Sequence, residues 1–304
     1  MAIKYELLLS RIPFLSVVIL PFILGSFAAS YFFGKFNLVI FLFGILGAMF
    51  IQLATYYSGE LYDIKEDRLS ITLEKNFFPG GSQVLVKSML APKKVKILTE
   101  VFVFLVLIIG IILQFYLQTG RWTLLLGISG LLCGLFYFKP PLRWVRPGVG
   151  EILVAYTYGW LAINAGFYIQ TGHFNFLITW ISLPVVCSIV NIILINEYPD
   201  YLADKAAGKM NLLVRRGKIK VAILYAFLVN CSAVTFLLAL VFGYPVVSGI
   251  FYFPVFILAI ILAGQMLRGD YNDRIKLEKI CKLTLLVSLG TSLSCILGLL
   301  VKKL

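Results

Sequence analysis

The sequence predicts an all-α, polytopic membrane protein: a bundle of nine transmembrane helices that forms one integral-membrane domain over residues 1–304. Hydrophobic residues make up 61% of the chain and charged residues only 13%, whereas about 25% of an ordinary soluble domain is charged. A helix needs about 20 apolar residues to cross a bilayer. Nine apolar runs approach that length, at roughly 13–33, 37–57, 97–118, 122–138, 150–170, 176–196, 221–243, 245–267 and 281–301. The first run is long and lacks a small-residue cleavage site, so no cleavable signal peptide is expected.

The distribution of basic residues predicts the orientation in the lipid bilayer. Of the 27 Lys and Arg residues, 23 lie before the first run or around 58–96, 139–146, 205–220 and 268–282. The opposite side has only Lys35, Arg121, Lys302 and Lys303. By the positive-inside rule, the N-terminus and the four long loops face the cytoplasm, and the C-terminus lies on the outer side of the cytoplasmic membrane. Membrane topology thus explains the net charge of +13, and no nucleic-acid partner is expected.

Two acidic groups with the same spacing close the second and sixth runs. They are Gly59-Glu60-x-x-Asp63-x-x-x-Asp67 and Asn196-Glu197-x-x-Asp200-x-x-x-Asp204. Residues four apart share one face of a helix, so each group presents two carboxylates side by side. A single such pair is ordinarily a solvated helix end. Two copies on the same predicted side of the membrane indicate a site at which they meet.

Facing carboxylate pairs form an all-oxygen site suited to Mg²⁺. Each acidic group precedes a basic loop that contains glycine, and a third basic cluster follows the fourth run. Lys209, Lys139 and Arg143 are candidates for direct contact with an anion, although cytoplasmic loops are also basic for topological reasons. The combination suits a diphosphate whose hydrocarbon tail lies in the helix bundle.

Aromatic side chains make up 15% of the chain, and their faces can stabilise an allylic cation when a carbon–oxygen bond to diphosphate breaks. Any single tyrosine is more often an interfacial anchor than a catalytic group. Those near the predicted site are Tyr56, Tyr57, Tyr62, Tyr137, Tyr156, Tyr158 and Tyr198.

Other site chemistries find no support in the sequence. The five cysteines are scattered, without C-x-x-C spacing, and are expected to be packing residues. His173 is the only histidine and falls on the predicted outer side, so zinc-hydrolase and histidine-triad chemistry are not expected. There is no Walker A sequence, and Gly148-x-Gly150 lacks the third glycine of a dinucleotide-binding motif.

The chain resembles the UbiA superfamily of intramembrane prenyltransferases over nearly its whole length. This resemblance implies a nine-helix bundle in which two Asp-rich motifs bind a prenyl diphosphate through Mg²⁺. It implies catalytic, metal-binding roles for Asp63, Asp67, Asp200 and Asp204. Glu60 is a further candidate ligand of the metal, and Asn196 matches a polar position of the second motif. With Lys209, Lys139 and Arg143, these two residues complete the expected substrate-binding set.

Segments 79–85, 150–154 and 204–214 resemble the 1,4-dihydroxy-2-naphthoate branch of that superfamily, which belongs to menaquinone biosynthesis. The resemblance implies transfer of a polyprenyl group to an aromatic acceptor, with loss of the acceptor carboxyl group as CO₂. Two departures leave the acceptor open. Gly59 and Glu60 stand where the first motif usually begins Asn-Asp, and Asn211 stands where the branch often has Thr.

Two alternatives remain at this stage. The same enzyme class could use another acceptor, either a different quinone precursor or a glycerol-phosphate lipid. A protein of another class, a secondary transporter, also combines repeats with intramembrane acids. A transporter would be indicated by charged or helix-breaking residues near mid-membrane, whereas the acidic groups here close the apolar runs.

Overall fold

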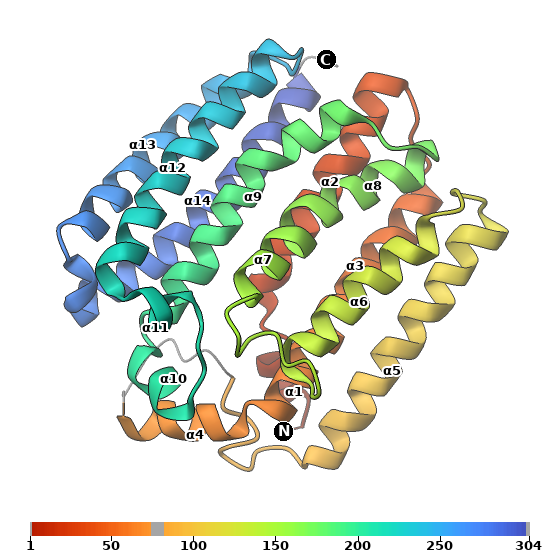
Figure 1. The fold of residues 1–304 in the computed structure, drawn as a ribbon. Helices are drawn as coiled ribbons and strands as arrows, with labels where there is room; N and C mark the ends of the chain where they lie inside the picture. Colours follow the sequence, from red (N-terminus) through yellow and green to blue (C-terminus); the bar gives the residue numbers. More distant parts are fainter. Residues whose placement is uncertain (1, 74–81, 302–304) are drawn as a thin grey trace.

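A computed structural model describes residues 2–73 and 82–301, with side chains for residues 5–72 and 82–301. The described residues form helices joined by short loops and contain no β-strand (Figure 1). The predicted all-α fold class is confirmed. Residues 79–81, which begin one of the segments with a family likeness, lie outside the described residues, as do Lys302 and Lys303.

Among the described residues, eight helical segments are long and apolar enough to cross a bilayer, so the chain is a multi-pass membrane protein. They are α2 (Ile12–Phe33), α3 (Leu38–Tyr62), α5 with η1 (Pro92–Ile111, Ile112–Tyr116), α7 with η2 and α8 (Gly150–Val154, Ala155–Leu161, Ala162–Thr171), α9 (Phe176–Glu197), α12 (Lys218–Val241), α13 (Ser248–Leu267) and α14 (Arg274–Val301). All eight coincide with predicted runs. The remaining run forms α6 (Thr123–Phe138), which at 16 residues is shorter than the others, or about 24 Å long.

Asparagine and glycine define several ends of these helices. The side chain of Asn37 begins α3 by accepting a hydrogen bond from the backbone N–H of Val39 at 2.9 Å, and Asn175 begins α9 in the same way. Gly34 and Gly172 end α2 and α8 with φ of 65° and 79°. Glycine adopts this left-handed conformation without steric cost, so the sequence ends both helices sharply.

Helices α2 and α8 pack closely because each has a glycine at their crossing. A Cβ on Gly25 would lie 1.9 Å from the carbonyl oxygen of Ile163, and one on Gly166 would lie 2.3 Å from that of Phe22. Ser26 Oγ also donates to the Gly166 carbonyl at 3.1 Å. Small residues allow backbones to approach in this way inside membranes, so neither glycine tolerates a larger side chain without movement of a helix.

Three spans contain an internal proline, at Pro21, Pro184 and Pro254. In each case the helix continues through the proline. Within residues 2–73 and 82–301, the structure therefore has none of the split half-helices that form substrate sites in many secondary transporters.

Four short helices gather at one end of the bundle (Figure 1). They are α1 (Ala2–Leu9), α4 (Ile64–Leu73), α10 (Tyr201–Ala207) and α11 (Leu212–Arg216). Helices α4 and α10 pack against each other there, while α14 ends at the opposite end of the bundle. The segments that carry the two acidic groups therefore meet at one end of the molecule.

Candidate functional site

A cavity of about 570 Å³ lies among α2, α3, α6, η2 and α9. Its wall near the short helices is acidic and polar, and it includes Glu60, Asp63, Asp67, Asn196, Asp200, Asp204 and Lys209. Farther into the bundle the wall becomes apolar and glycine-rich, with residues such as Gly47, Ile109, Gly127 and Leu161. The two acidic groups thus border a single space that continues among hydrophobic helices.

The first acidic group lies where α3 passes into α4. Asp63 directly follows α3, and the backbone N–H of Asp67, in the first turn of α4, donates to the Asp63 carbonyl at 2.9 Å. The Asp67 side chain is buried, and its Oδ2 has no hydrogen-bond partner among the described residues. Burial, with the nearby charges of Glu60 and Asp63, raises the pKa of Asp67 to about 8. Burial also raises the pKa of Asp63.

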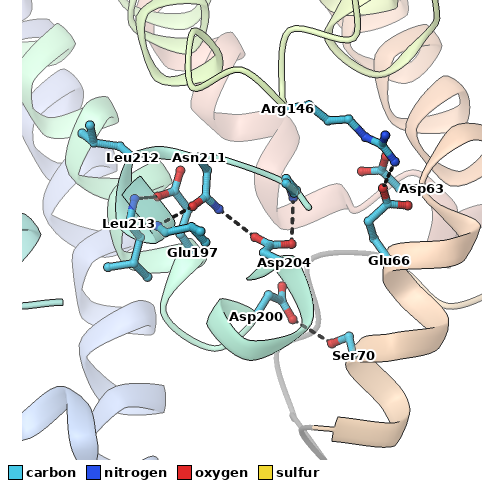
Figure 2. Close-up of polar contacts among 12 residues, drawn as sticks. Asp63, Glu66, Ser70, Arg146, Glu197, Asp200, Asp204, Asn211, Leu212 and Leu213 are labelled. Atoms are coloured by element: carbon cyan, nitrogen blue, oxygen red, sulfur yellow. Dashed lines mark hydrogen bonds and ion pairs between the residues drawn. The ribbon is translucent and has the colours of Figure 1, made fainter. Parts of the chain in front are cut away.

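Two arginines from the loop after α6 face this group. Arg143 Nη2 lies 3.1 Å from Asp63 Oδ1 and 3.2 Å from Glu66 Oε1. Arg146 Nη2 lies 2.8 Å from the same Glu66 oxygen (Figure 2). Burial alone would raise the pKa of Glu66, but the hydrogen bond from Arg146 and the charge of Arg143 lower it overall. Lys139, at the end of α6, is exposed and does not line the cavity.

The second acidic group lies at the start of α10 (Figure 2). Lys209 Nζ is 3.3 Å from Asp204 Oδ1, and Asn211 Nδ2 donates to Asp204 Oδ2 at 2.7 Å. Burial raises the pKa of Asp204 to about 6, against the opposing effect of the Lys209 charge. Ser70 Oγ, on α4, donates to Asp200 Oδ1 at 2.7 Å. The second group is therefore tied to the helix that follows the first.

Lys209 is coupled to the carboxylates of both groups. Burial on its own would lower the pKa of Lys209, but the charges of Asp204 and Asp63 raise it above its ordinary value. The Lys209 ammonium therefore stays protonated despite its position in the cavity wall. It contributes a fixed positive charge between two sets of carboxylates, which is the charge that an anionic ligand would contact.

Glu60 occupies the edge of the site nearest the bundle. Its Oε1 accepts a hydrogen bond from the backbone N–H of Ser82 and lies 3.6 Å from Arg11 Nη2, while Oε2 has no partner among the described residues. The neighbouring Gly59 packs against an aromatic ring, because a Cβ there would lie 2.9 Å from Phe138 Cε2. The departure from the usual Asn-Asp start therefore has a packing basis at Gly59.

Two further carboxylates of the cavity wall hold the start of α11. Glu151 Oε1 accepts from the backbone N–H of Leu212 at 2.6 Å. Glu197 Oε2 accepts from the backbone N–H of Leu213 at 3.2 Å (Figure 2). Asn211 caps the same short helix by accepting from the Val214 N–H. This arrangement fixes the segment from which Asn211 reaches Asp204.

Mg²⁺ fits this site only if oxygen atoms of water or of a bound substrate complete its coordination. Among the described residues, no three His, Cys, Asp or Glu side chains converge on one metal position. Mg²⁺ usually binds one or two carboxylates together with water and substrate phosphates, rather than an all-protein cage. The oxygen-only donor set and the unpaired, buried Asp67 Oδ2 agree with that mode of binding.

Several residues of the site were not singled out from the sequence. Arg11, Glu66 and Ser70 contact the predicted residues through tertiary packing. Only Glu66 had an available signal, because its position three residues after Asp63 puts it within the first motif. The roles of the predicted residues in binding and catalysis stay predictions.

The family pattern described as the UbiA prenyltransferase family matches residues 18–286. That range covers most of the chain and includes both acidic groups. The chain belongs to this family.

Two curated proteins that are similar to this chain have names that refer to naphthoate or naphthoquinone prenylation. The 1,4-dihydroxy-2-naphthoate octaprenyltransferase of Bacillus subtilis is 26% identical over 209 residues, which cover 69% of this chain and 65% of that protein. The 2-carboxy-1,4-naphthoquinone phytyltransferase of Synechocystis is 26% identical over 207 residues, covering 67% and 64%. The chain thus spans just under two thirds of the length of both relatives.

A solved structure extends the likeness to the whole fold. A UbiA homologue from Archaeoglobus fulgidus, determined with GPP and Mg²⁺ bound, aligns with a TM-score of 0.65 at 18% sequence identity. The alignment covers 96% of this chain and 99% of that one. Identity at this level supports the UbiA fold, and the fold alone.

Proposed function

We propose that this protein transfers a polyprenyl group from its diphosphate to an aromatic acceptor, 1,4-dihydroxy-2-naphthoate in menaquinone biosynthesis, in a Mg²⁺-dependent reaction. The observation that carries the proposal is the single cavity bordered by both acidic groups, with Lys209 between them and an apolar extension into the bundle. A lipid diphosphate matches both parts of this cavity. The family membership and the two naphthoate-prenylating relatives support the reaction class and the acceptor.

In this proposal the residues of the chain bind and orient the donor. Asp63, Asp67, Asp200 and Asp204 hold Mg²⁺, with Glu60 as a further ligand, and Asn196 contacts the head group. The bound metal would neutralise charge on the departing diphosphate. Lys209 and Arg143 bind the diphosphate directly through charge-assisted hydrogen bonds. Lys139 ranks behind them, because its side chain is exposed, whereas Lys209 lines the cavity and Arg143 pairs with Asp63.

The reaction balances as an electrophilic substitution. The bond between prenyl C1 and the diphosphate oxygen breaks, and its electron pair leaves with diphosphate. A ring carbon of the acceptor forms the new carbon–carbon bond. In the naphthoate case the attacked carbon carries the carboxylate group, which then leaves as CO₂, and the electron pair of the broken carbon–carbon bond restores the aromatic ring. Aromatic side chains of the cavity wall, among them Tyr137 and Tyr158, can stabilise positive charge on the prenyl group.

The proposed location is the cytoplasmic membrane, with the short helices and their acidic groups at the cytoplasmic face and the end of α14 outside. The basic loops support this orientation through the positive-inside rule. Cysteine labelling from either side of sealed vesicles, with single cysteines placed at exposed Lys205 and in the loop before α9, tests it. Labelling of the Lys205 site from the outside would contradict the assignment.

The test of activity uses the full-length protein in lipid nanodiscs with Mg²⁺, prenyl diphosphates of several lengths and a panel of acceptors. We expect diphosphate, prenylated naphthoate product and CO₂ in equal amounts. Asp67→Asn and Asp204→Asn should abolish turnover, while Asp270→Asn, which alters an ion pair with exposed Lys276, should not. Product without CO₂ would point to another acceptor. No product from any pair of substrates would overturn the prenyltransferase proposal.

A further inference from the structure

Helix α12 has an exposed asparagine at the middle of its span. Asn230 lies 12 residues after Lys218 and 11 before Val241, the first and last residues of α12, and its side chain is exposed. No other exposed polar side chain in the described residues lies so close to the midpoint of a spanning helix. The bilayer at this depth is hydrocarbon, which offers no hydrogen bonds. In a monomer, the Asn230 amide would therefore contact lipid.

The Asn230 amide has unused hydrogen-bonding capacity. Its Nδ2 donates to the carbonyl of Ala226, one turn earlier in the same helix, at 2.9 Å. That contact uses one of the two N–H groups of the amide, and no donor among the described residues reaches Oδ1. Polar groups in hydrocarbon are costly when they are unpaired. The free N–H and the free oxygen together require a partner that both accepts and donates at mid-membrane.

The asparagine lies within a stripe of large apolar side chains on α12. Counting Asn230, the members of the stripe follow one another at alternating intervals of four and three residues, so they project from one face of the helix. Each apolar member is more than half exposed. They are Ile223, Phe227, Val234, Leu237 and Val241. Alternating intervals of this kind form the seam along which two parallel helices pack in a coiled coil.

Contact with lipid explains a wholly apolar helix face but not this one. Helix α13 shows the difference: Ile250, Phe253 and Ile257 are exposed at similar intervals, and no exposed polar side chain lies near its midpoint. Lipid tails are as apolar as these residues, so such a face gains little by pairing with another helix, whereas hydrogen bonds between polar side chains do favour pairing. Asn230 therefore distinguishes α12 as a contact surface.

A second copy of the chain fits this surface because of symmetry. Copies in one membrane share one orientation, so the two-fold axis of a dimer is parallel to the membrane normal. Residues beside that axis face their own counterparts. Asn230 would meet the Asn230 of the second copy at the same depth, where each amide donates through Nδ2 and accepts through Oδ1. Phe227 and Val234 would pack on either side of the amide pair.

We propose that the protein forms a parallel homodimer through α12, in which the two Asn230 amides hydrogen-bond to each other at mid-membrane. The exposed apolar stripe of each copy packs against the other copy above and below that pair. No residue of α12 lines the cavity that the acidic groups border, so dimerisation leaves both cavities free. The inference is independent of the reaction that the protein catalyses.

Self-association is measured by energy transfer between full-length copies that have donor or acceptor fluorophores on an N-terminal tag. The copies are reconstituted together in lipid vesicles and diluted with lipid. We expect wild-type transfer to exceed random proximity and to follow a saturable dimerisation curve. Asn230→Leu should raise the protein-to-lipid ratio at half association about tenfold, through loss of the amide pair. Asn230→Gln, which keeps an amide, should retain most of the association.

Val234→Trp and Leu286→Trp form a matched pair of variants. Val234 is 56% exposed on α12, and Leu286 is 59% exposed on α14. A bulky indole beside Asn230 should hold the two copies of α12 apart, so Val234→Trp should abolish association while Leu286→Trp leaves it at the wild-type level. The thermal unfolding midpoints of both variants, measured at the highest lipid dilution, should equal that of the wild type and show that each variant is folded.

Three results would overturn the proposal. One is wild-type energy transfer that never exceeds random proximity. Another is unchanged association in Asn230→Leu, because the amide pair distinguishes this face from one that contacts lipid. The third is equal loss of association in Val234→Trp and Leu286→Trp, which would indicate a general effect of added bulk rather than a contact through α12.

Discussion

Ser70 Oγ donates a hydrogen bond of 2.7 Å to Asp200 Oδ1, across 130 residues of sequence. Ser70 lies on α4, which follows the first acidic group, and Asp200 precedes α10 in the second. The contact is buried, and α4 and α10 pack against each other around it. The distance between the two acidic groups is therefore set by the short helices as well as by the spans.

Replacement of Ser70 by alanine should loosen this connection. A hydrogen bond to a charged group contributes about 1.5–3 kcal/mol, so Ser70→Ala should lower the thermal unfolding midpoint and weaken binding of a prenyl diphosphate with Mg²⁺. Thr72→Val is the control, because exposed Thr72 bonds only to carbonyls of its own helix among the described contacts. Equal affinity of both variants for the prenyl diphosphate would show that the hydrogen bond between Ser70 and Asp200 does not shape the site.

Lys209 should contribute to diphosphate affinity through its charge. Lys209→Ala removes the ammonium held at Asp204 and should weaken binding of a non-hydrolysable prenyl diphosphate by about 1.5–3 kcal/mol. The exposed neighbour Lys205 offers a control of equal charge, and Lys205→Ala should leave the affinity unchanged. If both variants bind the prenyl diphosphate as tightly as the wild type does, Lys209 contributes only to membrane topology.

Metal binding should depend on pH between about 6 and 8. With pKa values raised to about 6 and about 8, Asp204 and Asp67 hold protons in the metal-free protein that Mg²⁺ must displace. The apparent Mg²⁺ affinity should therefore rise with pH through this range and level off above it. Calorimetry in buffers of different ionisation enthalpy will detect the released protons, and Asp67→Asn should remove the component near pH 8.

The raised pKa values of these carboxyl groups also predict how the stability of the metal-free protein changes with pH. A raised pKa in the folded state means that the folded protein binds more protons than the unfolded chain between pH about 4 and 8. Metal-free stability should consequently fall as pH rises through this window. Thermal melts with and without Mg²⁺ should diverge toward high pH. A metal-free melting temperature that increases from pH 5 to 8 would contradict these pKa directions.

The spans were predictable because their length and hydropathy are local properties. The approach of the acidic groups was also predictable, since both close runs that end on one side. The basic side chains that pair with these acidic groups were not predictable. Glu66 receives Arg143 and Arg146, whereas Lys139, equally basic in sequence, stays exposed. That choice depends on the path of the loop after α6, and no spacing rule encodes it. The fourth run, 122–138, shows the limit for length, since α6 is shorter than the eight spans.

Gly59 illustrates a departure from the family pattern that packing explains. Because a Cβ there would lie 2.9 Å from the Phe138 ring, Gly59→Asn should not restore the usual motif but overpack this contact, at a cost of about 1–3 kcal/mol. The thermal unfolding midpoint of this variant should fall. Adding Phe138→Leu should recover part of the loss, and if the single variant is as stable as the wild type, the ring is free to move aside.

Gly127 is expected to set the length of the prenyl chain. It lies on α6 and lines the cavity, and a Cβ added there would meet no atom within 4 Å. It stands eleven residues before Phe138, whose ring packs against Gly59 beside the acidic site, so about 16 Å of helix separates it from the head-group end. A side chain at this position would occupy space in the apolar part of the cavity without displacing the protein.

Gly127→Leu should therefore retain activity with geranyl diphosphate and lose more than about tenfold in kcat/KM with octaprenyl diphosphate, since each displaced methylene forfeits about 0.8 kcal/mol of burial. Gly264→Leu is the matched control: a helical glycine on α13 with the same open surroundings, but outside the cavity wall. Product lengths should be measured by mass spectrometry from mixed donors. An unchanged preference in Gly127→Leu would place the tail along another wall of the cavity, whereas an equal loss with both donors would indicate a general effect on the fold.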